Sequence, residues 1–293
     1  MRRVLAAARD CATLVFGLGL LSVILLSWAP CAWILRRLRP ADGGRFGRRA
    51  NRACIRFYLR ALEAVGAMHF DIGALDVLET SDDGPVIIAP NHPRLLDAFL
   101  VVSRLSNVVC IMKQDIDDSV FLGQAARLAG YISNDSAVQM IRDSVRTLKR
   151  GNHLLLFPEG TRTVREPVNP MTGAVGLIAS RAGVPVQTVF IECNSPYLRK
   201  GWPLLRRPQL PIRFRVRLGK RFAPPDDGRA FATILEQYFV DALAPAAAAK
   251  HSRAHDAADA VVEIAANPEP VPPARPVLAP ISRTASAIES HPT

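Results

Sequence analysis

Cysteine is scarce in this chain of 293 residues, and the few copies are scattered. The five thiols are widely separated and include no C-x-x-C pair: Cys11, Cys31, Cys54, Cys110 and Cys193. An odd number of dispersed cysteines indicates neither a disulfide framework nor a zinc site. We therefore expect free thiols in a reducing compartment and no metal centre.

Acidic residues and lysine are also in short supply. The chain has 26 Asp and Glu against 37 Lys and Arg, a net charge of +11, and all but five of the basic residues are arginine. Such a surplus predicts an anionic partner, which can be a nucleic acid, an anionic membrane surface or a phosphorylated substrate. No recognised nucleic-acid module is present, so we expect no nucleic-acid partner.

Residues 11–35 lack charge altogether and form the most apolar stretch of the sequence. The run exceeds the roughly 20 residues needed to cross a bilayer core, and Trp28 and Trp33 lie towards one end, as interfacial aromatics do. Arginines flank both sides, so the positive-inside rule sets no direction. We favour a retained anchor over a cleaved signal peptide, either spanning the membrane or dipping into it with a break near Pro30. A dipping element would leave the rest of the chain on the cytoplasmic side of the inner membrane.

Composition divides the chain into four segments. Residues 1–40 are the expected membrane anchor, and residues 41–69 predict a basic amphipathic helix, either a membrane-surface helix or a core helix with a solvated basic face. Residues 70–243 have the composition of a folded domain. Residues 244–293 are rich in alanine and proline and contain no aromatic residue, which predicts a disordered tail.

The folded domain alternates short apolar runs with helical patterns. The expected strands are residues 85–89, 107–112, 153–157, 186–191 and 212–218. The expected helices are residues 95–105, 120–129, 135–150 and 174–182. This alternation predicts an α/β fold with a mostly parallel central sheet flanked by helices.

A histidine and an aspartate follow the first of these strands. His92 lies at the junction between strand and helix, and Asp97 lies five residues later, where its side chain can point back at the imidazole. A carboxylate on one ring nitrogen fixes the tautomer and leaves the other nitrogen as a base. That base can take a proton from an alcohol as the alcohol attacks an acyl thioester, with no serine or cysteine nucleophile.

A second polar segment follows the apolar run at 153–157. It reads Phe157-Pro158-Glu159-Gly160-Thr161-Arg162. Proline and glycine predict a tight turn that directs Glu159 and Arg162 into the same crevice as His92. An arginine fork suits a phosphate group, and backbone N–H groups of the turn can assist.

These two segments together resemble the PlsC-type glycerophospholipid acyltransferase family, also called lysophosphatidic acid acyltransferases. The family carries an H-x-x-x-x-D motif, here His92 and Asp97, and an F-P-E-G-T-R motif, here residues 157–162 without a mismatch. A valine-proline block before an apolar run also matches, at Val184-Pro185-Val186. The resemblance covers residues 70–220.

The resemblance implies a role for each matched position. His92 is the general base and Asp97 orients it, while Glu159, Gly160 and Thr161 shape the acceptor site and Arg162 contacts the acceptor's phosphate. It also implies acyl-CoA or acyl carrier protein as the acyl donor, a membrane lipid as the acceptor, and neither cofactor nor metal.

Two blocks depart from the family pattern. The arginine of a middle G-x-x-F-I-x-R motif is replaced by Asn134, beside Asp135, and a basic pair is replaced by Met171 and Thr172. Arg94 and Arg127 are the candidates to supply the missing charge. One expected acceptor is therefore a lysophospholipid such as 1-acylglycerol-3-phosphate. The alternative is a less phosphate-dependent alcohol, such as a lyso-ornithine-type lipid or a polyene-type head group.

A non-enzymatic function is the remaining alternative. Residues 199–221 contain nine basic residues interspersed with Trp202 and Phe214, which suits an anionic membrane surface or an acidic carrier protein. On this interpretation the chain is a basic peripheral membrane protein that binds anionic lipid. Thioester consumption by the wild-type protein and by His92→Ala discriminates between the acyltransferase and this lipid-binding protein.

Overall fold

The computed structural model describes residues 2–38 and 44–244 of the chain. The described residues belong to one compact unit, residues 1–247. The predicted disordered tail, residues 244–293, lies outside the described part except for residue 244, which is the last described residue of a helix.

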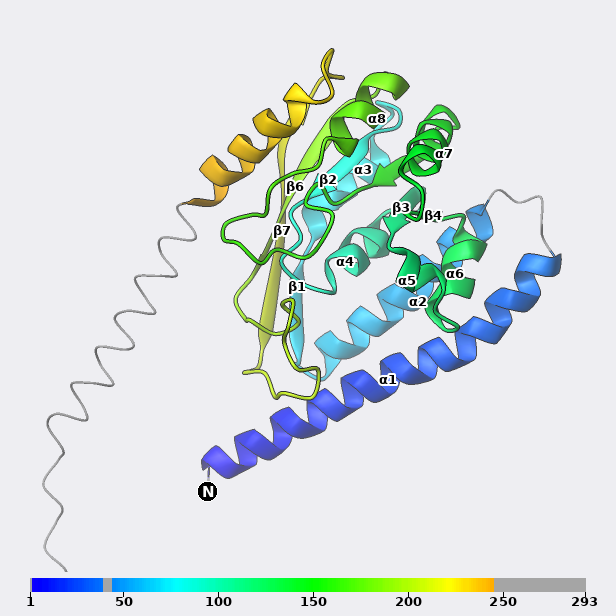
Figure 1. Ribbon diagram of the computed structural model, residues 1–293. Helices are drawn as coiled ribbons and strands as arrows, with labels where there is room; N and C mark the ends of the chain where they lie inside the picture. The colour runs from blue at the N-terminus through cyan, green and yellow to red at the C-terminus, as the bar shows by residue number, and fades with distance from the viewer. Residues whose placement is uncertain (1, 39–43, 245–293) are drawn as a thin grey trace, which may run out of the picture. The chain divides into compact units, whose positions relative to one another are not determined.

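A seven-stranded sheet forms the centre of this unit, with the strand order β1-β7-β6-β2-β5-β3-β4 (Figure 1). The strands are β1 Met68–Asp71, β2 Ile87–Pro90, β3 Val108–Met112, β4 Ile132–Ser133, β5 His153–Leu155, β6 Val186–Cys193 and β7 Ile212–Phe222. From β6 to β4 all neighbours are parallel, whereas β7 runs antiparallel to β6 and parallel to β1. The prediction of a mostly parallel sheet is confirmed.

Helices cover both faces of the sheet, because side chains alternate between the faces along each strand. Ile88 and Leu155 join a core that includes α2 and α4, whereas Ile87 and Leu154 join a second core that includes α7, α8 and the helix at 230–244. The helices are α2 Arg45–Ala64, α3 Asp76–Thr80, α4 Asp97–Arg104, α5 Gln114–Asp117, α6 Leu122–Ala129, α7 Ala137–Lys149 and α8 Ala174–Ala182, with a 3₁₀ turn at Gly73–Leu75.

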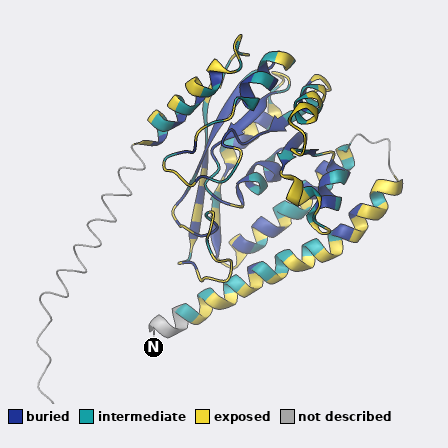
Figure 2. Cartoon of the chain, viewed as in Figure 1, coloured by how far each residue is buried: buried dark blue, intermediate teal, exposed yellow. Residues whose placement is uncertain are grey.

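The apolar N-terminal stretch forms one helix, α1, Arg2–Leu38. It continues through Pro30, so the break considered there is absent. Its segment Ala7–Leu38 is long and apolar enough to cross a membrane, and only 6% of its most apolar window is buried. Figure 2 shows exposed positions along α1. The helix packs against α2 and α6, and Trp28 Nε1 donates to Asn51 Oδ1 at 2.9 Å.

The structure differs from the sequence prediction in one helix boundary and in one additional helix. The helix expected over 41–69 ends at Ala64, because the chain turns at Gly66 and enters β1, which pairs with β7. In this helix Tyr58, Leu59 and Leu62 are buried, so α2 is a core helix with a basic outer face. The helix at residues 230–244 was not predicted. Its side chains Phe231, Leu235 and Phe239 are buried in the second core.

Candidate active site

Three loops converge at the carboxyl ends of neighbouring parallel strands. β2 lies between β5 and β6 in the sheet, so the segments that follow these strands start side by side (Figure 1). The loop after β2 carries His92, the loop after β5 carries Glu159 and Arg162, and the loop after β6 carries Ser195. This is the edge of an open α/β sheet where ligands bind.

The predicted pair of His92 and Asp97 is in direct contact. His92 Nδ1 and Asp97 Oδ2 are 2.9 Å apart, and the Arg94 backbone N–H donates to the same oxygen at 2.6 Å. Asp97 is the first residue of α4 and is fully buried. Burial raises the pKa of its carboxyl group, and the hydrogen bonds from His92 and Arg94 partly oppose that rise. Among the described residues, nothing donates a hydrogen bond to Asp97 Oδ1.

The imidazole ring is held by stacking as well as by the carboxylate. His92 and Phe157 lie with ring centroids 3.9 Å apart and an interplanar angle of 21°. The His92 side chain remains 18% exposed. No hydrogen bond to Nε2 occurs within the described part of the chain. With Nδ1 directed at Asp97, Nε2 is the nitrogen available to a substrate.

Glu159 is occupied by internal hydrogen bonds. Its Oε1 accepts the His92 N–H and the Thr163 hydroxyl, and its Oε2 accepts the Asn169 N–H, each at 2.8 Å. The residue is buried, and burial raises its pKa while these three donors oppose the rise. Glu159 therefore fixes the backbone of His92 rather than presenting a free carboxylate to an acceptor.

Arg94 and Asn91 also hold the His92 loop in place. The buried Arg94 guanidinium donates from Nε and Nη2 to the Ser195 carbonyl at 2.8 and 2.5 Å, and from Nη1 to the Pro93 carbonyl at 2.8 Å. The Asn91 amide bonds both the N–H and the C=O of Ile191 in β6. The geometry gives Arg94 a bracing role, since its three nitrogens already have acceptors, and does not favour the predicted contact with substrate.

The remaining motif positions form the turn after β5. Gly160 has φ +65°, a left-handed conformation that favours glycine. Arg162 Nη1 donates to the carbonyls of Leu198 and Arg199 at 3.1 and 3.3 Å, and Lys200 Nζ lies 3.4 Å from Thr161 Oγ1. Within the described residues, Arg162 Nε and Nη2 make no hydrogen bond. Arg162 and Lys200 are therefore cations that can meet an anionic ligand at this edge.

The positions that depart from the family pattern supply no cation. Asn134 is exposed after β4, and its Oδ1 accepts the Gln114 N–H at 3.1 Å. Arg127, proposed from the sequence as a substitute, donates to the side chain and backbone of Asp117 at 2.9 and 2.8 Å. Over residues 2–38 and 44–244, no cluster of three His, Cys, Asp or Glu side chains could hold a metal ion.

Several residues of the site were not found from the sequence. Asn91, Thr163, Asn169 and Ser195 all take part in the bracing network. The only signal for Asn91 is an amide placed directly after a buried strand. The other three lie in loops, where polar residues are common and carry no such signal.

Comparison with known proteins gives consistent results. The sequence model of the family described as Acyltransferase matches residues 71–192. A 1-acyl-sn-glycerol-3-phosphate acyltransferase of Brassica napus chloroplasts, BAT2, is 29% identical over 40% of this chain and 35% of its own length. The 1-acyl-sn-glycerol-3-phosphate acyltransferase of Pseudomonas aeruginosa is 22% identical over 50% of this chain and 58% of its own length. The matches thus span about a third to three fifths of these curated relatives.

A solved structure shares the fold. The crystal structure of the 1-acyl-sn-glycerophosphate acyltransferase PlsC from Thermotoga maritima aligns with a TM-score of 0.59. The alignment covers 83% of this chain and 98% of that one, at 17% sequence identity.

Proposed function

The chain belongs to the PlsC-type acyltransferase family, and we propose that it moves a fatty acyl chain from a thioester to the hydroxyl group of a lysophospholipid, with His92 as the general base. The observation that carries the proposal is the contact between His92 Nδ1 and Asp97 Oδ2 beside a free, accessible Nε2. The donor is acyl-CoA or acyl carrier protein.

The chemistry follows from the tautomer. An ionised carboxylate only accepts hydrogen bonds, so Nδ1 carries the proton and Nε2 carries a lone pair. Nε2 takes the proton of the acceptor hydroxyl while the oxygen of that hydroxyl attacks the thioester carbonyl carbon. The carbon–sulfur bond then breaks, and the departing thiolate receives the proton from Nε2. The products are an ester and a free thiol, and Asp97 stabilises the transient imidazolium.

A 1-acylglycerol-3-phosphate-like acceptor is supported by the cations beside the catalytic pair. Arg162 retains two guanidinium nitrogens without protein acceptors, and Lys200 lies near Thr161 at the same edge. Guanidinium groups bind phosphate through paired N–H donors. Arg94 is not assigned a contact with the acceptor, because its guanidinium is buried against backbone carbonyls.

A second acceptor class is favoured by one observation. Exposed Asn134 stands where the family pattern has a phosphate-binding arginine, and Asp135 beside it would repel a phosphate. A lipid or specialised-metabolite alcohol without a phosphate, such as a lyso-ornithine-type lipid, would avoid that repulsion.

A membrane location forms part of the proposal. The apolar segment Ala7–Leu38 is supported as an anchor by its length and its exposure. We infer the inner membrane, with the catalytic domain on the cytoplasmic side, where thioester donors are made. Such an anchor lets the enzyme take its lipid acceptor directly from the bilayer.

The test is an acceptor screen with the purified protein in detergent, using acyl-CoA and acyl carrier protein as parallel donors. We expect ester formation with wild-type protein and a loss of about 10²-fold to 10⁴-fold in kcat for His92→Ala. Full activity in the variant would refute the His92 mechanism. Absence of transfer to any acceptor from either donor would favour the lipid-binding alternative.

In cells, a deletion strain separates the two acceptor classes. Accumulated lysophosphatidic acid supports the first class. Unchanged phospholipids together with one missing specialised lipid support the second.

A further inference from the structure

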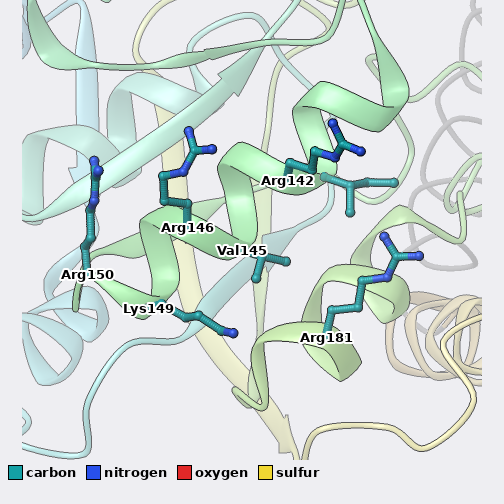
Figure 3. A pocket seen from close by; sticks show the side chains of 7 residues that line it. Arg142, Val145, Arg146, Lys149, Arg150 and Arg181 are labelled. Carbon is teal, nitrogen blue, oxygen red and sulfur yellow. The ribbon is translucent and has the colours of Figure 1, made fainter.

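A hollow lies between α7 and α8, apart from the proposed catalytic pair. It has a volume of about 440 Å³ and is lined by Ile141, Arg142, Val145, Arg146, Lys149, Arg150 and Arg181. We call these seven residues the α7–α8 groove. Figure 3 shows the aliphatic Val145 between the basic side chains of Arg142, Lys149 and Arg181, while Arg146 and Arg150 point to the other side of α7. An apolar floor with a cationic rim is the pattern that accepts an acidic amphipathic helix.

The basic residues of the groove are largely free of internal partners. Arg146 is paired with Asp143 at 2.7 Å, whereas the described ion pairs include none for Arg142, Lys149, Arg150 or Arg181. Cations near a helix C-terminus are favoured by the helix dipole, which accounts for Lys149 and Arg181. The dipole effect falls off within one turn, so it does not account for Arg142, seven residues before the end of α7.

The position of the groove favours a soluble partner over a membrane surface. Side chains of α1 pack against the core that contains α2 and α4, while α7 and α8 cover the opposite face of the sheet. A bilayer that holds α1 therefore meets the first face, and the groove opens towards water.

Helix α8 connects the groove to the catalytic edge. Its N-terminal end follows Thr172, whose N–H donates to the carbonyl of Pro158 at 2.9 Å, beside Glu159. Its other end carries Arg181 in the groove. Nine helical residues span about 13 Å. A donor whose acyl chain hangs on a long flexible arm can thus dock at the groove and extend the arm to the site.

We propose that the α7–α8 groove is the docking surface for an acidic acyl carrier protein. An acidic helix of the carrier lays its apolar face on Ile141 and Val145 while its carboxylates pair with the arginines. This inference rests on the proposed acyl transfer and names the donor for it. Acyl-CoA has no such helix and does not depend on the groove.

The experiment compares charge reversal in the groove with the same change elsewhere. The variant Arg142→Glu/Arg181→Glu alters two exposed groove residues. The control Arg49→Glu/Arg60→Glu makes the same change in net charge on exposed residues of α2, across the sheet. A charge-preserving variant, Arg142→Lys/Arg181→Lys, separates charge from folding. Binding of palmitoyl-acyl carrier protein and kinetics with palmitoyl-acyl carrier protein or palmitoyl-CoA are measured on full-length protein in detergent.

We expect the groove reversal to raise the Kd and the KM for the carrier substrate about tenfold or more, because reversed charges repel the acidic partner. The KM for palmitoyl-CoA stays unchanged, and the α2 control and the lysine variant retain carrier binding. The effect of the reversal shrinks at high salt.

Three results would overturn the docking proposal: no carrier binding by wild-type protein, equal weakening by the α2 control, or equal loss of the two donors. If the groove reversal weakened binding to phosphatidylcholine–phosphatidylglycerol vesicles and left carrier binding unchanged, the groove would be assigned to lipid instead. Carrier binding at the groove without transfer from either donor would sustain docking and refute the proposed function.

Discussion

At the scale of single residues, the carboxylate of the proposed catalytic pair is held at a cost to stability. Asp97 is fully buried, and one of its two oxygens has no donor among the described residues. A buried oxygen without a partner is unusual and expensive, and such groups concentrate at functional sites. Stability and activity are therefore expected to respond oppositely when this side chain is changed.

Asp97→Asn is the substitution that separates the effect on stability from the effect on activity. The amide oxygen can take the place of Oδ2, because both His92 and the Arg94 N–H require an acceptor there. The amide lacks the charge that stabilises the imidazolium, so kcat should fall about 10²-fold or more. The free energy of unfolding at neutral pH should stay equal to the wild-type value or rise.

The wild type and Asp97→Asn can also be compared by the pH dependence of their free energy of unfolding. Burial raises the folded-state pKa of Asp97 above that of an unfolded carboxyl. The associated stability is fully present below the unfolded pKa and is lost as pH rises through the folded value. Denaturant unfolding from acid to neutral pH should show the wild type losing stability relative to Asp97→Asn. The opposite slope would mean that the carboxylate is net stabilised in the fold.

Glu159 gives a second prediction at this scale. Its carboxylate accepts three hydrogen bonds, from His92, Thr163 and Asn169. A glutamine in its place directs an NH₂ group at one of these donors and leaves a buried donor unpaired, at about 1–3 kcal/mol. Glu159→Gln should therefore lower both the free energy of unfolding and kcat, measured by urea unfolding and initial rates.

The control for Glu159→Gln is Thr163→Val, which removes a single hydroxyl donor and keeps the bond to the His92 backbone. Its expected cost is about 1 kcal/mol with kcat nearly unchanged. If Glu159→Gln keeps full stability and loses only acceptor affinity, Glu159 contacts the substrate instead of bracing the loop.

At the scale of elements, apolar runs and helical periodicity predicted the central strands well. The strands that carry the site, β2, β5 and β6, are short apolar runs followed by the polar segments at 91–97 and 157–162. The edge strands were missed, because β4 has only two residues and β1, Met68–Asp71, is not an apolar run: it contains His69 and Asp71. The helix at 230–244 was missed although the sequence contains its signal, because Phe231, Leu235, Phe239 and Leu243 recur every four residues and form one buried face.

The site was predictable only as far as local sequence determines it. His92 and Asp97 meet because they lie only five positions apart, across the junction between β2 and α4. The bonds of Asn91 to Ile191 and of Arg94 to Ser195 join residues about 100 positions apart, and sheet order alone brings them together. Arg94 therefore looked like a free cation in the sequence and is a buried brace in the fold.

Helix α8 depends on one close backbone approach. A Cβ atom on Gly176 would lie much closer to the Gly228 carbonyl oxygen than van der Waals contact allows, and that oxygen belongs to the backbone and cannot rotate away. Gly176→Ala should destabilise the fold by about 1–3 kcal/mol despite the better helix propensity of alanine. Thermal or urea unfolding measures the change, with Ser180→Ala on the same helix as the control. A stabilised variant would show that α8 moves away from the 228 turn without cost.

At the scale of the whole unit, the sheet separates two surfaces of different character. One face carries α1, with its exposed apolar side chains, and the other carries the basic α7–α8 groove. The loop at 199–211 extends the first surface, because its Pro208 and Leu210 line a small hollow together with Leu14 and Gly17 of α1. The carbonyls of Leu198 and Arg199, where this loop begins, accept the Arg162 hydrogen bonds, so the loop connects the α1 surface to the proposed acceptor site.

The exposed tip of this loop is expected to enter the bilayer surface. Leu204 and Leu205 are 50% and 80% exposed, and Arg206 lies over the Trp202 ring at 4.8 Å. Apolar side chains flanked by arginines bind an anionic interface through both burial and charge. Leu204→Asp/Leu205→Asp should weaken binding to phosphatidylcholine–phosphatidylglycerol vesicles about tenfold or more in flotation assays.

The matched control for the loop is Val138→Asp on α7, since Val138 is 62% exposed on the opposite face of the sheet. It should leave vesicle binding unchanged. With a short-chain, water-soluble acceptor, the loop variant should keep its turnover, because substitutions at the tip leave the Arg162 bonds to the loop's backbone intact. Equal vesicle binding by the loop variant and the wild type would leave α1 as the sole membrane contact of this face.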